Sequence, residues 1–395
     1  MTVLLTALVA VTPLSIDMPL PALPDLGREY QAGSAGAQLI ISVFILGFAF
    51  SQLLQGPLSD AFGRRPVLLG GLGLYLASSL LCMLAPTMEL LITARFLQGF
   101  SACAAPVVAR AIVRDAYEGP RAARVFSIIA AGMGIAPVIA PTIGGFVLIW
   151  FGASQIFALL AGTAAVLLLA VLFVLPETNV RRNPAAFRPA RFVSNYLLLL
   201  RHPTFRGYVA VSVCASGGLF AYLSGSSFVL IDVLEVPAHH FGLYFALVAS
   251  GHIAGALCSG TLAERLGSRH LLTVSTVISA TAGVVMAALA WAGVETVSAI
   301  VAPMCLYMFG FGITMPNCMA GAVNPFPQMA GAASAMMGFL QMTSSAAVGA
   351  LVGHLDDGTT FPMAGMIALM AVLAAATFLA FARGDGNPDR QEPRA

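Results

Sequence analysis

The chain has 395 residues, of which 59% are hydrophobic and only 9% are charged. Soluble domains carry about 25% charged residues, so this composition excludes a water-soluble protein and indicates an integral membrane protein. All 19 basic residues are arginines, and the absence of lysine excludes a GxxxxGK(S/T) phosphate-binding loop and a Schiff-base mechanism.

Twelve apolar runs are long enough to cross a bilayer, whose core takes about 20 mostly apolar residues as a helix. The first run contains Asp17, lacks a preceding basic segment and has no small-residue cleavage site, so we expect it to be retained as a helix. The expected spans are 3–22, 37–57, 66–86, 90–113, 124–150, 154–175, 205–230, 240–262, 270–292, 296–318, 329–352 and 361–382.

The expected fold is all-α, with twelve transmembrane helices in two pseudo-symmetric six-helix bundles. A weak internal repeat supports two halves, since GPLSDAFGRRPVLL follows the second run and GTLAERLGSRHLL follows the eighth. Repeated six-helix halves are typical of transporters. The expected organisation is an N-terminal bundle (1–175), a cytoplasmic linker rich in arginine and proline (176–204), a C-terminal bundle (205–383) and a cytoplasmic tail (384–395).

Arginine placement predicts the orientation, because cytoplasmic loops carry an excess of basic residues. If the loop after the second run is cytoplasmic, nearly all loop arginines lie on that side, and the opposite loops contain only Arg28. Both termini are therefore expected in the cytoplasm.

The loop between the second and third runs, GPLSDAFGRRP, resembles motif A of the major facilitator superfamily, GxLxDxxGRR. The resemblance implies a gate in which Asp60 faces the positive N-terminal end of a helix from the other half. Arg64 would pair with Asp115 at the cytosolic end of the fourth helix. The alternative is that these charges only enforce the orientation. The implied gate residues are Gly56, Asp60, Gly63, Arg64, Arg65 and Asp115.

Three further stretches resemble motifs of a more specific group within this superfamily. RFLQGFSACAAPVVARAIVRD (95–115) is similar to motif B, and GMGIAPVIAPTIGG (132–145) is similar to motif C of proton-coupled drug antiporters. TPLSIDMPLPALP (12–24) resembles the signature of the Bcr/CflA drug-resistance subfamily, although Pro19 stands where that subfamily usually has an aromatic residue. An ordinary packing seam would explain the glycines of motif C but explains its prolines less well. The motif C residues are Gly134, Pro137, Pro141, Gly144 and Gly145.

Two charged residues, Asp17 and Arg95, lie well inside predicted spans of the first half. Ionisable side chains are costly there and mark ion or substrate paths. At 1.5 Å per residue, both fall at a similar depth in the outer half of the bilayer. A carboxylate near a fixed cation is suited to proton exchange, so we interpret the two as a proton-coupling site. The alternatives are a structural ion pair and a carboxylate at the outer water boundary.

Aromatic and polar side chains inside otherwise apolar helices are candidate substrate contacts, although each alone is more often a packing residue. Neither the six cysteines nor the six histidines show metal-ligand spacing, so we expect no metal and no cofactor besides a coupling proton. The candidate contacts are Phe44, Gln52, Tyr222, Phe228, Tyr307, Phe311, Asn317 and Gln341.

These features favour a proton-driven exporter of small amphipathic drugs in the bacterial inner membrane, acting as a monomer and without nucleic acid. The resemblance implies bicyclomycin-, chloramphenicol- or sulfonamide-like compounds. A proton symporter that imports a nutrient or metabolite is the alternative, which motif C disfavours. A membrane enzyme would need a catalytic cluster of His, Asp, Cys or Ser, which the sequence does not contain.

Overall fold

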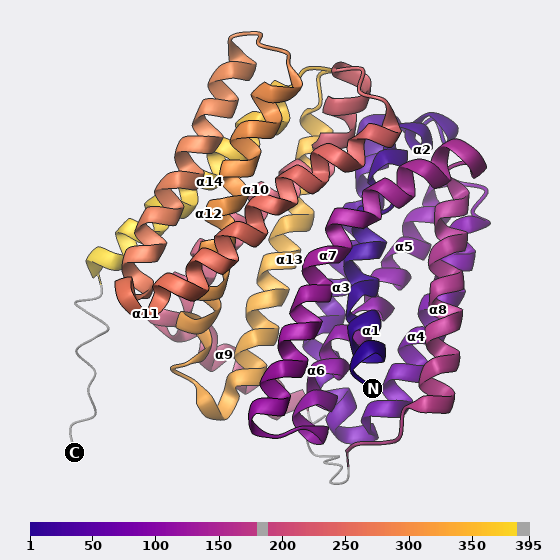
Figure 1. Ribbon diagram of the computed structural model, residues 1–395, viewed down its shortest axis with the longest axis vertical. Coiled ribbons are helices and arrows are strands. Elements are labelled where there is room, and N and C mark those ends of the chain that lie inside the picture. Colours follow the sequence, from indigo (N-terminus) through magenta and orange to yellow (C-terminus); the bar gives the residue numbers. More distant parts are fainter. Residues whose placement is uncertain (180–188, 385–395) are drawn as a thin grey trace.

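The computed structural model describes residues 1–179 and 189–384, and this part of the chain is helical without a β-strand (Figure 1). Twelve of its helical segments are long and apolar enough to cross a membrane, which confirms the twelve predicted spans. They are Thr2–Glu29, Gly33–Phe62, Arg64–Met83, Met88–Ala116, Arg124–Phe151, Ser154–Val174, Pro203–Val233, Ala238–Ala263, Arg265–Trp291, Val297–Val323, Pro327–Leu355 and Phe361–Phe381.

The N-terminal half packs α1 on α7, α3 on α5, and α4 on both α5 and α8. Its elements are α1 (Thr2–Asp17), η1 (Leu20–Ala22), α2 (Leu23–Glu29), α3 (Gly33–Phe62), α4 (Arg64–Met83), α5 (Met88–Ala102), α6 (Ala104–Ala116), α7 (Gly119–Phe151) and α8 (Ser154–Val174).

The C-terminal half packs α11 on α12 and α14, and α10 on α13 and α14. A helix also forms inside the stretch expected to be a linker, where α9 (Pro189–Arg201) packs on α10 and α13. The other elements are α10 (Pro203–Ser227), the π-helix η3 (Phe228–Val233), α11 (Ala238–Trp291), α12 (Val297–Val323), η4 (Pro327–Met329), α13 (Ala330–Leu355) and α14 (Phe361–Gly384).

Two of the predicted spans are interrupted, and proline accounts for both interruptions. Proline has no N–H, so the carbonyl four residues before it loses its helical partner. Pro19 deprives the Ser15 carbonyl in this way, and α1 ends at Asp17. Pro106 does the same to the Ala102 carbonyl, and α5 ends at that residue.

The repeat seen in the sequence has the same backbone role in each half. Gly63 joins α3 to α4 with a φ of 106°, and Gly267 lies at a kink inside α11 with a φ of 73°. Only glycine adopts such angles readily. The kink divides α11 into the eighth and ninth spans.

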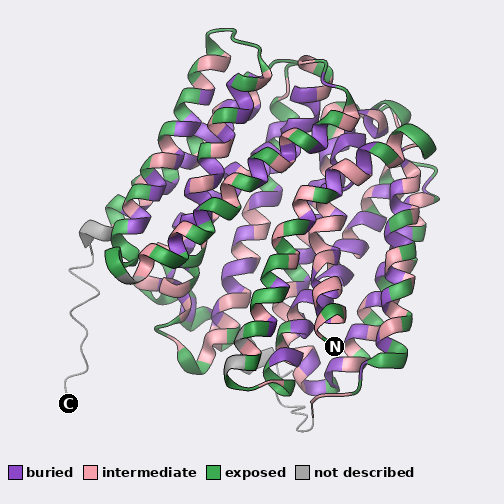
Figure 2. Cartoon of the chain, viewed as in Figure 1, coloured by how far each residue is buried: buried purple, intermediate pink, exposed green. Residues whose placement is uncertain are grey.

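The outward faces of the helices carry large apolar side chains. Phe173 of α8 is 80% exposed and Trp291 of α11 is 82% exposed. Figure 2 shows exposed residues along the outer helices and buried ones between the helices. Such a surface is an aggregation hazard in water but is suited to lipid.

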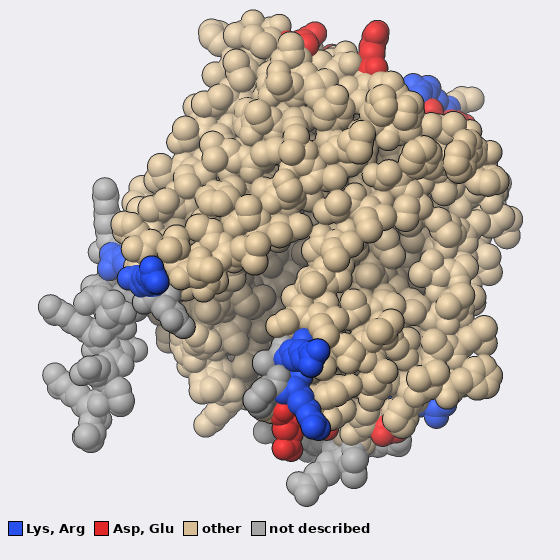
Figure 3. Space-filling view, in the orientation of Figure 1, with Lys and Arg blue, Asp and Glu red and all other residues tan. Residues whose placement is uncertain are grey.

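The two halves meet mainly through α3 against α13 and α7 against α11. We call one end of the molecule the Arg-rich end, where Arg64, Arg65 and Arg114 lie, and the other the Arg-poor end, where Arg28 lies. In Figure 1, α7 and α11 lie close together toward the Arg-poor end and diverge toward the Arg-rich end. The space-filling view is hollowed between the halves on that diverging side (Figure 3).

Candidate functional site

Asp17 is the last residue of α1 and is only 4% exposed. Among the described residues, no hydrogen bond or ion pair involves its carboxylate. The backbone at the neighbouring Met18 lies against α7 at Gly144. An ionised carboxylate enclosed in this way is costly within a membrane. Asp17 is therefore the strongest candidate for a side chain that takes up and releases a proton.

Arg95 is fully buried in the N-terminal half and makes three hydrogen bonds. Its Nη1 donates to Gln98 Oε1 at 2.6 Å, its Nε to the Ile40 carbonyl at 3.1 Å, and its Nη2 to the Ser15 carbonyl at 3.1 Å. Its guanidinium carbon lies 4.4 Å from the ring centroid of Phe44, a cation–π contact. Arg95 thereby links α5 to α1 and α3.

The polar network around Arg95 extends to α4. Gln98 Nε2 donates to Ser79 Oγ at 2.7 Å, and the hydroxyl groups of Ser15 and Tyr75 share a hydrogen bond. The Ser15 carbonyl is available to the guanidinium because Pro19, four residues later, has no N–H to donate to it. The break in the first span and the position of Arg95 are thus two parts of one arrangement.

Arg95 does not form an ion pair with Asp17, which was one of the alternatives left open by the sequence. Within the part of the chain that the structure describes, the guanidinium binds the Ser15 carbonyl and no ion pair joins the two side chains. Residues two apart on a helix point to different sides. Arg95 therefore reaches the backbone of α1 without meeting the carboxylate of Asp17.

The turn between α3 and α4 is held by Arg64. Its Nε donates to Asp115 Oδ2 at 2.8 Å, and its Nη1 donates to Asp60 Oδ1 at 2.5 Å and to Ser59 Oγ at 2.8 Å. The Arg64 side chain is 10% exposed and that of Asp60 is 50% exposed. The ion pair between Arg64 and Asp115 that the sequence predicted is present.

Asp60 does not meet a helix of the other half in this conformation. Its carboxylate accepts from Arg64, and no hydrogen bond joins it to a described residue of the C-terminal half. This agrees with the divergence of the halves at the Arg-rich end (Figure 1). Arg65 points elsewhere, since its Nη2 donates to the Leu172 carbonyl of α8 at 2.5 Å. Gly56 makes no close approach, because a Cβ there would meet nothing within 4 Å.

The last two residues of motif C lie where helices approach most closely at the Arg-poor side. A Cβ at Gly144 would lie 1.9 Å from the Met18 carbonyl oxygen, and one at Gly145 would lie 2.8 Å from the Ala238 carbonyl oxygen. A side chain at either position would force the backbones apart. The pair therefore lets α7 contact α1 in its own half and α11 in the other. The remaining motif C residues, Gly134, Pro137 and Pro141, lie within the unbroken helix α7.

An ion pair joins the two halves at the Arg-poor end. Arg28 Nη1 of α2 lies 3.2 Å from Asp232 Oδ1 of η3, and Arg28 Nη2 lies 2.6 Å from Asp25 Oδ1. A cavity of about 260 Å³ lies beside it, and its lining includes Phe228 and Asp356. Direct contacts between the halves thus close this end.

The candidate substrate contacts are not gathered around one cavity. Phe44 is fully buried against Arg95, and Phe228 lines the cavity at the Arg-poor end. Tyr222 is fully buried and stacks on Phe245 of α11, with ring centroids 6.1 Å apart. Phe44 and Tyr222 thus pack inside the protein in this conformation, whereas Phe228 borders a cavity.

Two further candidates form hydrogen bonds within the C-terminal half. Tyr307 donates its hydroxyl to the Ala215 carbonyl at 2.7 Å. Asn317 Nδ2 donates to Ser259 Oγ at 2.9 Å. Both side chains hold α12 against its neighbours in this conformation.

Gln52 and Gln341 lie at or beside the contact between the two halves. The side-chain amide of Gln52 on α3 lies against Gly338 of α13. Gln341 Nε2 of α13 lies 3.4 Å from Met315 Sδ of α12. Amides and a thioether in this position are adaptable contacts, so these residues remain candidates for the transport path.

The sequence analysis did not identify several residues that contact the candidate sites or lie inside a membrane span. Gln98 belongs to the RxxQG stretch of motif B, so its signal was present. His252 lies in the eighth span with its ring 5.5 Å from that of Phe311, and an embedded histidine is itself a signal. Glu177 and Asn179 bind the turn between α3 and α4 from a stretch that the sequence marks only as a linker.

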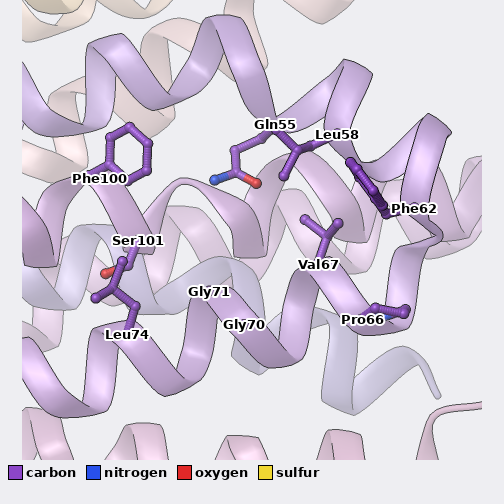
Figure 4. A pocket seen from close by; sticks show the side chains of 10 residues that line it. All are labelled: Gln55, Leu58, Phe62, Pro66, Val67, Gly70, Gly71, Leu74, Phe100 and Ser101. Carbon is purple, nitrogen blue, oxygen red and sulfur yellow. The ribbon is translucent and has the colours of Figure 1, made fainter. Parts of the chain in front are cut away.

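A groove with a volume of about 380 Å³ lies on α3, α4 and α5 (Figure 4). Its lining comes from the N-terminal half alone, and none of the candidate substrate contacts on the described chain contributes to it. An apolar groove of this kind on an outer surface suits lipid rather than a path between the halves. The lining residues include Leu58, Phe62, Val67, Leu74 and Phe100.

Comparison with known proteins gives a consistent result. The family model described as Major Facilitator Superfamily matches residues 5–350. An uncharacterized MFS-type transporter, YdgK, of Bacillus subtilis (strain 168) is 32% identical over 95% of this chain and 93% of its own length. A bicyclomycin resistance protein homolog of Haemophilus influenzae is 28% identical over 92% of each chain.

A solved structure shares the fold. The bacterial homolog of the human lysosomal transporter Spinster, in an inward-facing and occupied conformation, superposes with a TM-score of 0.79. The comparison covers 98% of both chains at 14% sequence identity.

Proposed function

Because this chain belongs to the Major Facilitator Superfamily, we propose that it exports small amphipathic drugs in exchange for protons. Its twelve membrane-spanning helices and its bacterial relatives make it a multi-pass bacterial membrane protein that transports small molecules and is not an enzyme. The homology to a bicyclomycin resistance protein homolog supports drugs as the cargo. Proton coupling rests on the geometry around Asp17.

The observation that carries the proposal is the enclosed, unpaired carboxyl group of Asp17. It is 4% exposed at the break after α1, and the described residues offer it no ion pair. Binding a proton removes the cost of an enclosed charge, and contact with water allows its release. If the conformational change exposes the Asp17 carboxyl group to each side of the membrane in turn, this group can carry a proton inward while drug is exported.

Alternating access supplies that motion. In the conformation described here the halves are in contact at the Arg-poor end, and α7 and α11 diverge toward the Arg-rich end. The opposite conformation would part Arg28 from Asp232 and bring Asp60 toward the other half. Proton and drug can each shift this equilibrium only by binding one conformation more tightly than the other.

We propose that the Arg-rich end faces the cytoplasm, as basic loops usually do, and that the chain works as a monomer in the inner membrane. Both termini then lie in the cytoplasm. The proposed cargo class comprises bicyclomycin-, chloramphenicol- or sulfonamide-like compounds, because an apolar path without a fixed charge discriminates weakly among them.

The test is a susceptibility panel with these three compound classes in a bacterium that lacks its own drug exporters. Expression of this chain should raise resistance to at least one compound, and expression of Asp17→Asn should not. Inverted membrane vesicles should release protons from their interior when that compound is added. Unchanged susceptibility to every compound, together with no drug-induced proton movement, would contradict the proposal.

The same vesicles distinguish a drug exporter from a symporter that imports a nutrient. An exporter loads inverted vesicles with drug when the interior is acidified, whereas a symporter discharges its solute from such vesicles under the same gradient. The close approach at Gly144 and Gly145 of motif C favours the exporter.

A further inference from the structure

Residues 177–179, which lie shortly after the end of α8, contact both helices of the turn held by Arg64. Glu177 places its carboxylate across the start of α4. Oε1 accepts from the backbone N–H of Arg64 at 3.0 Å, and Oε2 accepts from that of Arg65 at 3.2 Å. The first N–H groups of a helix have no partner within the helix. A carboxylate is the most favourable acceptor there, because it also complements the helix dipole.

Asn179 binds the other side of the same turn. Its Nδ2 donates to the Ser59 carbonyl at 3.3 Å and to the Asp60 carbonyl at 3.1 Å, both in the last turn of α3. The last carbonyls of a helix likewise lack partners, and amide N–H groups complement that end. Asn179 is itself fixed, because its backbone N–H donates to Glu177 Oε1 at 2.8 Å.

The residue between them touches the gate directly. Thr178 Oγ1 lies 3.5 Å from Asp115 Oδ2, the oxygen that accepts from Arg64. One short segment thus binds the end of α3, the start of α4 and the acid at the end of α6. We call residues 177–179 the rim clamp.

The turn has little else to fix its shape. Gly63 joins the helices with a φ of 106° and without a side chain. The Arg64 guanidinium must meet Asp115 and Asp60 at once, so a small rotation of α4 relative to α3 would break one of the two ion pairs. The rim clamp binds the backbone on both sides of Gly63 and opposes that rotation.

We propose that Glu177 and Asn179 are positioning residues of the gate, holding the α3–α4 turn so that Arg64 spans Asp60 and Asp115. They act through the backbone and do not touch the drug path, so they govern the change of conformation rather than drug affinity. The clamp also ties the start of the stretch between the halves to the gate. The inference adds to the proposed function. Only its transport measurement depends on that function, because the labelling measurement needs no drug.

The variants are Glu177→Ala, Glu177→Gln and Asn179→Ala, with Glu118→Ala as the matched control. Glu118 is a second glutamate at the Arg-rich end; it is exposed and makes no capping hydrogen bond to α7. Glu177→Gln keeps one acceptor oxygen and the side-chain shape, so it should fold even if Glu177→Ala does not. Thermal unfolding in detergent measures the folded fraction of each variant.

The conformational readout needs no drug. Ser42 is 4% exposed where α3 contacts α13 near Gly349, so a cysteine there is protected while the Arg-poor end is closed. In a transport-competent background without the six native cysteines, Ser42→Cys is labelled with a membrane-impermeant maleimide from the Arg-poor side. The labelling rate then reports how often that end opens.

The clamp and both ion pairs of Arg64 are formed while the Arg-poor end is closed, so loss of the clamp should destabilise this conformation and let the Arg-poor end open more often. A lost helix cap corresponds to about a fivefold change in such an equilibrium. Ser42→Cys labelling should become faster by up to that factor in Glu177→Ala and Asn179→Ala, and less so in Glu177→Gln. In proteoliposomes the kcat for chloramphenicol export should fall, because the return to the described conformation is less favourable, with KM unchanged. Glu118→Ala should match the parent in both assays.

Unchanged labelling and unchanged kcat in folded Asn179→Ala and Glu177→Gln would overturn the inference. A lower unfolding temperature with normal labelling and kcat would also overturn it, since that result indicates a purely structural role. If labelling becomes faster but the parent protein exports no compound of the panel, the clamp stands and the proposed drug export fails.

Discussion

The guanidinium of Arg95 donates to the carbonyl of Ser15 at 3.1 Å. That carbonyl is free because residue 19 is a proline and the α-helix stops at Asp17. An embedded arginine with no acidic partner among the described side chains is thus accommodated by backbone dipoles and by the amide of Gln98. The arrangement fixes the end of α1, where Asp17 lies, to the middle of the N-terminal half.

Replacing Arg95 should destabilise the fold. Hydrogen bonds inside membrane proteins contribute about 0.6 kcal/mol each on average, and charged donors contribute more. Arg95→Ala loses three of them and leaves the Ser15 carbonyl without a partner, so we expect a loss of about 2 kcal/mol or more in the free energy of unfolding. Arg95→Lys keeps the charge but not the fork of donors and should lose less.

Unfolding in a denaturing detergent measures this difference. The dependence of export on pH tests the role suggested by the sequence, that Arg95 is the fixed cation of Asp17. With no ion pair between the two, we expect folded Arg95→Lys to keep the parental pH profile. A profile displaced to higher pH in folded Arg95→Ala would restore the direct pair.

Pro19→Ala should alter the end of the first span. The alanine can donate its N–H to the Ser15 carbonyl, so α1 can continue past Asp17 and compete with Arg95 for that acceptor. We expect several-fold slower export at normal expression, because the Asp17 carboxyl group would turn with the extended helix. Pro24→Ala is the matched control, since that proline lies beyond the break in α2. Equal export rates in the two variants would show that the break has no functional role.

Asp17→Asn should abolish the coupling of drug export to protons while leaving the protein inserted. The asparagine has nearly the same shape and cannot exchange a proton. Drug-induced proton release from inverted vesicles measures the effect, with Glu29→Gln as the control because Glu29 is an exposed acid at the end of α2. Normal proton release in Asp17→Asn would assign coupling to another group.

Reversing the charge of Arg28 should disturb closure of the Arg-poor end, and a second charge reversal at Asp232 should restore it. Arg28→Asp places a carboxylate beside Asp232 and Asp25 and should favour opening of that end. The pair is exposed, so its contribution is about 0.5 kcal/mol and the expected change in Ser42→Cys labelling is about twofold. Arg28→Asp with Asp232→Arg should return labelling toward the parental rate. Faster labelling that persists in the double variant would mean that the pair does not close this end.

The rim clamp should be insensitive to pH in the physiological range. Partial burial alone would raise the pKa of Glu177, but the N–H groups of Asn179, Arg64 and Arg65 hold that pKa below its usual value. A carboxylate whose pKa is depressed on folding stabilises the fold above its unfolded pKa, about 4.3 for glutamate, and loses this contribution as pH falls through the folded value.

The ratio of export rates between Glu177→Gln and the parent should therefore stay constant from about pH 6 to pH 8. Parallel rate measurements in proteoliposomes at each pH give this ratio. A ratio that changes steadily across the range would mean that Glu177 titrates during transport, and would reject the assignment of Glu177 to a fixed capping role.

The sequence alone was sufficient for features that depend on composition and short spacing. The twelve spans follow from runs of apolar residues, because a bilayer demands that length of helix. The repeat in the sequence placed equivalent turns in the two halves, and the structure has a glycine with positive φ in each of them, Gly63 and Gly267. The pair between Arg64 and Asp115 was predicted from the resemblance of the turn to motif A, and the structure has it at 2.8 Å.

The tertiary structure decided the partners of the charged groups. Depth in the bilayer can be counted along a helix, and that count placed Asp17 and Arg95 at one level. The direction of each side chain around its helix depends on how α1 breaks and packs, so Arg95 binds the Ser15 carbonyl instead. Glu177 lies more than a hundred residues from the helix start that it caps, and no local pattern encodes such a contact. The partner of Asp60 depends on which end of the molecule is open, because rigid halves exchange contacts when they rock.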